Sequence, residues 1–397
     1  MPVTTGVHTA VVALLWWAMS ANAGWSGYVA GEYRGFVDDP LDPAQHQHYG
    51  SLAIQPEYRQ AWDNGRQAVK FAPFARWDSG DPERTHADLR ELYWLKAGES
   101  YEWRVGVRKV FWGVTESQHL VDVINQTDLV ENLDGEDKLG QPMANLALIG
   151  KWGTIDLFAL PYFRERTFPG REGRLRTPLV VDSDQAVYES GRGKRHVDWA
   201  VRWSHHLGVW DIGLSHFYGT SREPRLVPGV SAGGLPVLIP HYDLIHRTGL
   251  DLQATVGNWL WKLEAIRQEG ELDTFGAATA GLEYTFTGVF GASADAGIVL
   301  EYLYDNRDAR ATSPFQDDVM LGVRLALNDV QSSEALLGVI VDRDSDARLY
   351  SIEASRRLGV HWKLGVEARA FSRQTPEDFL YTLRRDDYLQ VELAYYF

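Results

Sequence analysis

The most constraining feature of this sequence is a two-residue alternation that places charged side chains between apolar ones. In the last ten residues, 388–397, apolar residues occupy every second position, and Gln390 and Glu392 lie between them. The same alternation recurs at 196–206 and 360–372. Successive residues of a strand point to opposite faces of a sheet. Because a charged face is costly in a dry core but normal beside water, the pattern favours a barrel with a wet interior over a soluble sandwich.

Eighteen segments with this character follow one another along the chain. They lie near 25–35, 50–60, 67–77, 87–97, 100–110, 142–151, 154–163, 196–206, 209–219, 246–256, 259–269, 274–286, 293–304, 316–327, 334–343, 347–357, 360–372 and 386–397. We therefore predict an all-β chain that forms a closed antiparallel transmembrane β-barrel of about 18 strands, with sixteen strands as the alternative count.

The gaps between these segments give an internal check on the count. If the first strand starts in the periplasm, every even-numbered gap must be a periplasmic turn, and these gaps are only a few residues long. The odd-numbered gaps include the long segments 111–141, 164–195, 220–245, 305–315 and 373–385. Short periplasmic turns and long extracellular loops are typical of bacterial barrels, and an even count returns the carboxyl end to the periplasm.

The composition excludes several classes of protein. The chain has 397 residues and a mean hydropathy of -0.29, and beyond its amino-terminal region no apolar run approaches the roughly 20 residues of a spanning helix. A helical membrane protein is therefore excluded. The 15 tryptophans and 18 tyrosines are residues that gather at membrane interfaces. The absence of cysteine excludes disulfides and thiolate metal sites, and the net charge of -15 argues against a nucleic-acid partner.

The first 23 residues have the features of a secretory signal peptide. An apolar run at 11–19 precedes the small residues 20–23, which read Ser-Ala-Asn-Ala and form an A-x-A cleavage site. We predict a signal peptide at 1–23, export to the periplasm and a single barrel domain at 24–397. Residues 1–9 contain no lysine or arginine, so a buried amino-terminal helix of a soluble domain remains the alternative.

The third external loop, 111–141, is both apolar and acidic. Leu120, Val121, Val123 and Ile124 are too apolar to remain in water, so we expect the loop to fold inward onto the barrel wall. From residue 114 onward it carries seven acidic residues against one lysine, whereas the next long loop is rich in arginine. Opposed acidic and basic walls would order water and select solutes by charge.

These charges define a predicted pore constriction, which also includes basic residues on the neighbouring strands. Its acidic side consists of Glu116, Asp122, Asp128 and Glu131, and its basic side consists of Lys70, Arg76, Arg104 and Arg108, with Arg90 on the same wall. The alternative is that the charges are solvated or bind divalent cations between lipopolysaccharide molecules. We expect no cofactor, no metal site and no catalytic residue.

An inward-folded third loop resembles the porins of Gram-negative outer membranes. In addition, residues 107–113 and 122–129 resemble a motif (V-x-W-G, then D-x-I-N-P-x-D-L) of large proteobacterial outer-membrane proteins of unassigned function, with Gln126 in place of the proline. The resemblance implies an integral outer-membrane channel for passive diffusion of small hydrophilic solutes, surrounded by lipid and lipopolysaccharide. It also implies that the assembly machinery reads the terminal aromatic Phe397, and that the chain forms a homotrimer.

Two other functions are compatible with parts of the sequence. A conduit or export channel for a hydrophobic or aromatic compound would use Trp94, Trp103, Phe111 and Trp112, which equally suit an interface girdle. A barrel hydrolase would use Ser204, His205, His206 or His216, but adjacent strand residues point to opposite faces. His46 and His48, with Asp38, Asp39 and Asp42, could hold a metal, and a solvated loop is the simpler interpretation.

Overall fold

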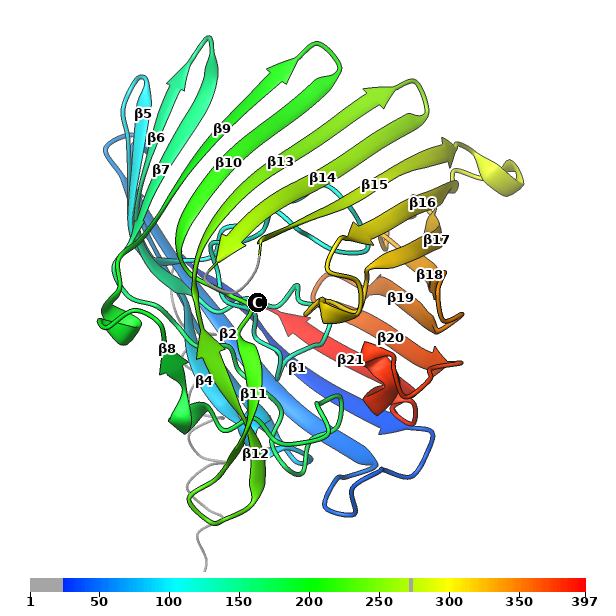
Figure 1. Ribbon diagram of the computed structural model, residues 1–397. Coiled ribbons are helices and arrows are strands. Elements are labelled where there is room, and N and C mark those ends of the chain that lie inside the picture. The colour runs from blue at the N-terminus through cyan, green and yellow to red at the C-terminus, as the bar shows by residue number, and fades with distance from the viewer. Residues whose placement is uncertain (1–23, 271–273) are drawn as a thin grey trace, which may run out of the picture.

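The computed structural model describes residues 24–270 and 274–397. The predicted signal peptide, 1–23, lies outside the described residues. Within them, no helix is long and apolar enough to cross a membrane. The chain instead forms a closed ring of eighteen antiparallel strands (Figure 1), which confirms the predicted fold class and strand count.

Each predicted segment corresponds to one strand of the ring, with ends that differ by a few residues. The strands are β1 (Trp25–Phe36), β2 (His48–Trp62), β3 (Gln67–Asp78), β4 (His86–Ala97), β5 (Tyr101–Arg108), β6 (Gln141–Gly150), β7 (Gly153–Leu160), β9 (Asp198–Leu207), β10 (Trp210–Thr220), β13 (Leu244–Val256), β14 (Trp259–Gly270), β15 (Thr274–Phe286), β16 (Asp295–Asp305), β17 (Asp317–Ala326), β18 (Glu334–Asp342), β19 (Arg348–Leu358), β20 (Trp362–Ser372) and β21 (Tyr388–Tyr396).

The first and last strands close the ring. β1 pairs with β21 from Tyr28↔Tyr396 to Phe36↔Tyr388. Beyond this register, Gly27 and Phe397 each donate a backbone hydrogen bond to the other at 3.1 Å. Gly27 has φ 146°, and a Cβ atom there would lie 2.3 Å from the carbonyl oxygen of Gln55 on β2, so only glycine fits at this point of β1. Closure leaves no unpaired strand edge. The interior of a bilayer requires this, because backbone groups there must be paired within the protein.

The outer surface of the ring is apolar and the inner surface is polar. Large hydrophobic side chains are exposed on strands all around the ring, among them Trp94, Trp103, Leu214, Trp261, Leu300 and Leu393. A soluble monomer does not expose such a continuous apolar surface. In the final strand Leu389 and Leu393 are exposed outward, whereas Tyr388 and Ala394 are buried. This is the alternation that the sequence predicts.

A β-bulge interrupts the alternation of β4. Ala72 on β3 pairs with Glu91 and Pro73 pairs with Leu89, so Arg90 is an additional residue with no partner in the ladder. A bulge re-aims a side chain, and here Arg90 turns into the lumen. Proline has no backbone N–H to donate, so its position at the irregularity costs the ladder little.

The external loops contain three short strands that the sequence reading placed in irregular loops. β11 (Arg225–Val230) and β12 (Pro236–Tyr242) form a hairpin, and β8 (Val187–Tyr188) pairs with β12 in parallel. Prolines at 228, 236 and 240 obscure the strand pattern in this segment. Short 3-10 helices lie at Pro82–Arg84 (η1), Ser183–Gln185 (η2), Gly193–Arg195 (η3), Val289–Gly291 (η4), Asp308–Arg310 (η5) and Phe379–Leu383 (η6).

Candidate functional site

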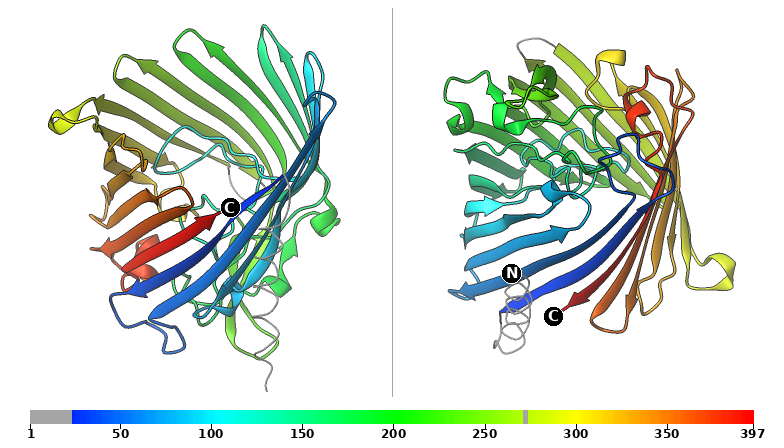
Figure 2. Two further views of the ribbon diagram at one scale, coloured as in Figure 1. Left: turned by 180° about the vertical axis from the view of Figure 1, so that it is seen from behind. Right: turned by 90° about the horizontal axis from the view of Figure 1, so that it is seen from below.

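The third loop, residues 109–140, lies inside the barrel (Figures 1 and 2). Val121, Val123 and Ile124 are buried in one cluster with Trp112. The wall contributes Met143, Phe158, Phe217, Ile245 and Phe275 to the same cluster. Burial of these side chains is worth roughly 1.5–3 kcal/mol each, which stabilises the loop within the lumen.

Two glutamates of the wall hold the first part of the loop by its backbone. The fully buried carboxylate of Glu264 on β14 accepts hydrogen bonds from the N–H groups of Val114 (2.7 Å), Thr115 (3.0 Å) and Val121 (3.1 Å), and from the hydroxyl of Thr115 (2.8 Å). Glu301 on β16 accepts the N–H groups of residues 116 (2.7 Å) and 117 (2.8 Å). A buried carboxylate is tolerated when its oxygens accept several hydrogen bonds.

Arginines of the opposite wall hold the second part of the loop by contacting acidic side chains of the loop. Arg76 on β3 contacts Glu131 at 2.7 Å, and Arg90 on β4 contacts Asp128 at 2.7 Å. Arg84, in the short external loop between these strands, donates to the backbone carbonyl of Glu131 at 3.3 Å. The acidic residues of the loop therefore meet a basic wall, and the contacts are buried charge pairs.

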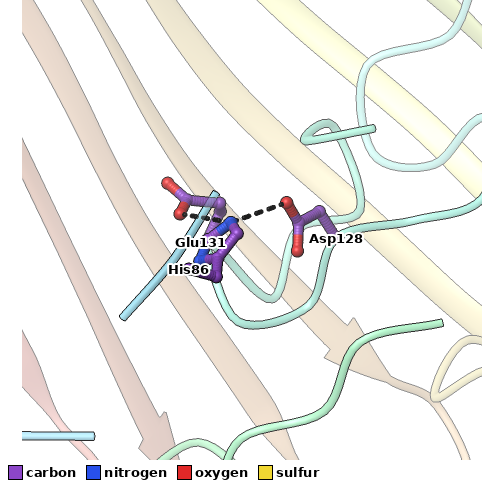
Figure 3. A group of neighbouring side chains, drawn as sticks. All are labelled: His86, Asp128 and Glu131. Atoms are coloured by element: carbon purple, nitrogen blue, oxygen red, sulfur yellow. Dashed lines mark ion pairs between the residues drawn. The ribbon is translucent and has the colours of Figure 1, made fainter. Parts of the chain in front are cut away.

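A histidine joins the same network (Figure 3). The Nε2 atom of His86 lies 3.5 Å from a carboxylate oxygen of Asp128 and 3.5 Å from one of Glu131. Burial alone would raise the pKa of Asp128, but the nearby His86 imidazole and the charge of Arg90 lower it to about 2.

The same three side chains are close enough to one another to hold a metal ion. A divalent cation would nevertheless lie beside Arg76 and Arg90, which already neutralise both carboxylates. The group is therefore better suited to a charge network that fixes the loop than to a metal centre.

The loop also contacts a third part of the wall. Asp134 lies 3.0 Å from Arg369 on β20, and the amide of Asn132 donates to Glu367 at 3.0 Å. Together with the contacts on β14, β16, β3 and β4, these contacts carry the loop across the lumen rather than along one side of it.

The loop separates two cavities. The loop-side cavity has a volume of about 300 Å³ and opens among the long external loops, and the turn-side cavity has a volume of about 780 Å³ and faces the short turns. Five residues line both cavities: Glu116, Asp134 and Glu136 from the loop, with Leu336 and Glu353 from the wall. We call these five the passage residues, because they lie between the two cavities.

Acidic side chains dominate the passage and the turn-side cavity. Eight carboxylates but only two basic side chains, Arg324 and Lys363, line the turn-side cavity. Glu116 pairs with Arg324 and lies 3.7 Å from Lys262. Beside the passage, burial alone would lower the pKa of the His119 imidazole, but Glu136 and Glu264 raise it to about 9. Carboxylates therefore outnumber basic side chains around the turn-side cavity.

The predicted constriction residues occupy different environments. Glu116 lies at the passage, whereas Asp122 is buried against Lys138 at 3.1 Å. Asp128, Glu131 and Arg76 are buried in the charge network. Two others pair with neighbouring strands, Lys70 with Glu57 (3.4 Å) and Glu91, and Arg108 with Asn145 (2.8 Å), whereas Arg104 pairs with Glu102 on its own strand.

Sequence reasoning missed Glu264, Glu301 and Glu353. The available signal was a glutamate at an inward position of a strand, which is common in any wet barrel.

The candidates for other functions are dispersed. No hydrogen bond joins Ser204 to a histidine among the described residues; His206 instead pairs with Asp211 at 2.8 Å. His46 lies 3.4 Å from Glu172, and His48 contacts Tyr33 at 2.9 Å, outside any group of three metal-ligand side chains in the described ranges. Trp94 and Trp103 are exposed on the outer surface, Phe111 is exposed, and Trp112 is buried in the apolar cluster that the loop forms with the wall.

Comparison with known proteins supports the fold. No protein-family model matches the chain, and no curated protein sequence matches it. Among solved structures it is similar to Wzi of Escherichia coli, an outer-membrane carbohydrate-binding β-barrel involved in group 1 capsule assembly, with a TM-score of 0.53 and 10% identity over 97% of this chain and 86% of Wzi. It is also similar to mutants of Rh. blastica porin, for example with a TM-score of 0.47 and 12% identity over 94% of this chain and 99% of the porin. The fold is that of an outer-membrane β-barrel.

Proposed function

We propose that the chain is a porin-like channel for passive diffusion of small hydrophilic solutes, with a constriction formed by the third loop and a preference for cations. The observation that carries this proposal is the pair of cavities that meet at the passage residues. Because four of these five residues carry a carboxylate, a permeating cation would exchange part of its hydration shell for carboxylate oxygens.

The lining argues against a conduit for hydrophobic compounds. Trp94 and Trp103 face the outer surface, where they suit a membrane interface. The turn-side cavity is lined mainly by charged and small polar or aliphatic side chains and contains no aromatic ring. We also propose that the chain is not an enzyme, because the serine and histidines that could form a hydrolase site are not joined.

The proposed surroundings follow from the fold. The apolar outer surface suits outer-membrane lipid and lipopolysaccharide. Phe397, paired with Gly27 at the seam of the ring, is the proposed signal for the assembly machinery after export through the periplasm. A homotrimer is the proposed oligomer.

The test is single-channel recording of refolded protein in planar bilayers, with reversal potentials measured in a salt gradient. We expect ion conductance with cation selectivity, and Glu353→Gln should move the reversal potential toward anions because it removes an acidic side chain from the passage. Glu377→Gln, which changes an exposed loop residue outside both cavities, is the matched control. A protein that folds and inserts but carries no ion current would refute the channel.

A further inference from the structure

Four arginines from different segments line the loop-side cavity at its external end. They are Arg166, Arg222, Arg247 and Arg307. Three of them have a carboxylate at ion-pair distance: Arg222 with Asp198 (2.7 Å), Arg247 with Glu223 (3.3 Å) and Arg307 with Asp305 (2.6 Å).

Arg166 differs from the other three. Its backbone N–H donates to the hydroxyl of Tyr242 at 3.1 Å, and its Nε donates to the amide oxygen of Gln126 at 3.3 Å. Among the described residues, no carboxylate lies at ion-pair distance from its guanidinium. Burial lowers the pKa of Arg166, and the charge of Glu223 only partly opposes this shift.

Within the arginine cluster itself, the guanidinium groups therefore exceed the paired carboxylates by one, while carboxylates of the third loop line another part of the cavity. Four guanidinium groups face three carboxylates, and Glu223 is shared, because Arg247, Arg166 and Arg307 together overcome the effect of burial and lower its pKa to about 2. A charge held in partly buried surroundings without its own counterion is unfavourable. An anion that entered the cavity would remove this cost.

The rest of the cavity suits a polar organic solute. Gln118, Thr312 and Ser313 carry amide and hydroxyl groups. Phe275 offers an apolar surface, with the guanidinium of Arg307 3.5 Å from its ring centre. The volume of about 300 Å³ lies at the small end of the range for small-molecule sites.

We propose that the loop-side cavity binds a small solute that carries one carboxylate and several hydroxyl groups, with the carboxylate on Arg166. A planar guanidinium binds a carboxylate through two parallel hydrogen bonds. The single excess charge matches a monoanion rather than a phosphate dianion. The role of this site as a filter rests on the proposed channel function, but the binding itself does not require conductance.

Isothermal titration calorimetry of the folded, detergent-solubilised protein tests the site. Gluconate is the probe, gluconamide is its uncharged analogue, and inorganic phosphate is the dianion. We expect gluconate to bind more tightly than both, and Arg166→Gln to weaken gluconate binding by roughly tenfold or more, since a lost charge-assisted contact exceeds 1.4 kcal/mol. Arg171→Gln, an exposed arginine of the same loop, should leave the affinity unchanged.

A second variant should change the affinity for gluconate in the opposite direction. Glu223→Gln should tighten gluconate binding several-fold, because it frees Arg247 and raises the excess from one positive charge to two. Structural damage would weaken binding instead, so this increase distinguishes a binding site from a fold effect.

Several results would overturn the site: equal affinity for gluconate and gluconamide, unchanged affinity in Arg166→Gln, or tighter binding of phosphate. Conductance recorded on the same preparation separates the two proposals. Ion current without gluconate binding overturns the site and leaves the channel, whereas gluconate binding without ion current supports the site and refutes the channel.

Discussion

The two sides of the barrel hold the third loop by opposite chemistry. On β14 and β16, the carboxylates of Glu264 and Glu301 accept hydrogen bonds from backbone N–H groups of the loop. On β3 and β4, Arg76 and Arg90 contact carboxylates that the loop itself supplies. The first contact depends on the path of the loop backbone, and the second depends on the side chains of the loop.

This difference determines how each contact fails. On the glutamate side, a single carboxylate accepts the hydrogen bonds of several backbone N–H groups. Removing that carboxylate therefore breaks all of these hydrogen bonds at once. The charge pairs share partners: Glu131 is close to both Arg76 and His86, and Arg76 also contacts Glu32 at 3.1 Å. We therefore expect the glutamate side to be sensitive to single substitutions and the arginine side to be more tolerant.

The largest expected effect comes from Glu264→Ala. It leaves three backbone N–H groups without their acceptor, whereas the Thr115 hydroxyl keeps the backbone carbonyl of Gln118, and it should lower the free energy of unfolding by about 3–5 kcal/mol. The first part of the loop should leave the wall, and single-channel conductance should rise several-fold.

Glu269→Ala is the matched control, because Glu269 lies on the same strand, half exposed beside Arg267. It should change neither stability nor conductance measurably. Unaltered conductance in a correctly folded Glu264→Ala protein would contradict the idea that the loop restricts the path.

A smaller effect is expected on the arginine side. Arg76→Met and Glu131→Gln should each destabilise the protein, and a double-mutant cycle should give a coupling energy of about 2 kcal/mol. The coupling energy is limited because Glu131 still contacts His86 when Arg76 is replaced, and Arg76 still contacts Glu32 when Glu131 is replaced. Urea or thermal unfolding measures all three variants, and strictly additive losses would show that the pair contributes no direct interaction.

The ring was predictable from the sequence because its signal is local. Alternation within ten residues determines both faces of a strand, and the last strand, 388–397, shows it without interruption. β4 is the exception, since the additional residue Arg90 shifts the alternation by one position. A bulge depends on the pairing with β3, which no single segment reveals.

The anchoring of the loop was only half predictable. An excess of acidic residues in the loop and basic residues on the wall predicts opposite charges in proximity, and Arg76 and Glu131 meet in this way. Glu264 could not be found, because its partners lie about 150 residues earlier and are backbone groups. A backbone N–H group leaves no trace in the sequence, so this contact appears only in three dimensions.

The smallest expected effect is a pH dependence of the loop. The pKa of His119 is raised to about 9 in the folded protein, so its contribution is complete below the unfolded value near 6.5 and is lost as pH rises through 9. Asp137 acts in the same direction: its enclosure by the barrel and the charges of Glu131 and Asp134 raise its pKa to about 7, so ionisation adds repulsion as pH rises.

Between pH 6 and 9.5 we therefore expect the loop to lose roughly 1 kcal/mol of stabilisation, a figure limited by the exposed position of Glu136 beside His119. Conductance should rise gradually over this range. His119→Gln should remove the part of the rise near pH 9 and leave the part near pH 7, because Glu264 and Glu136 would then have no cationic partner to lose. A conductance that falls with rising pH would mean that neither group holds the loop, and that Glu264 accepts the backbone amides independently of His119.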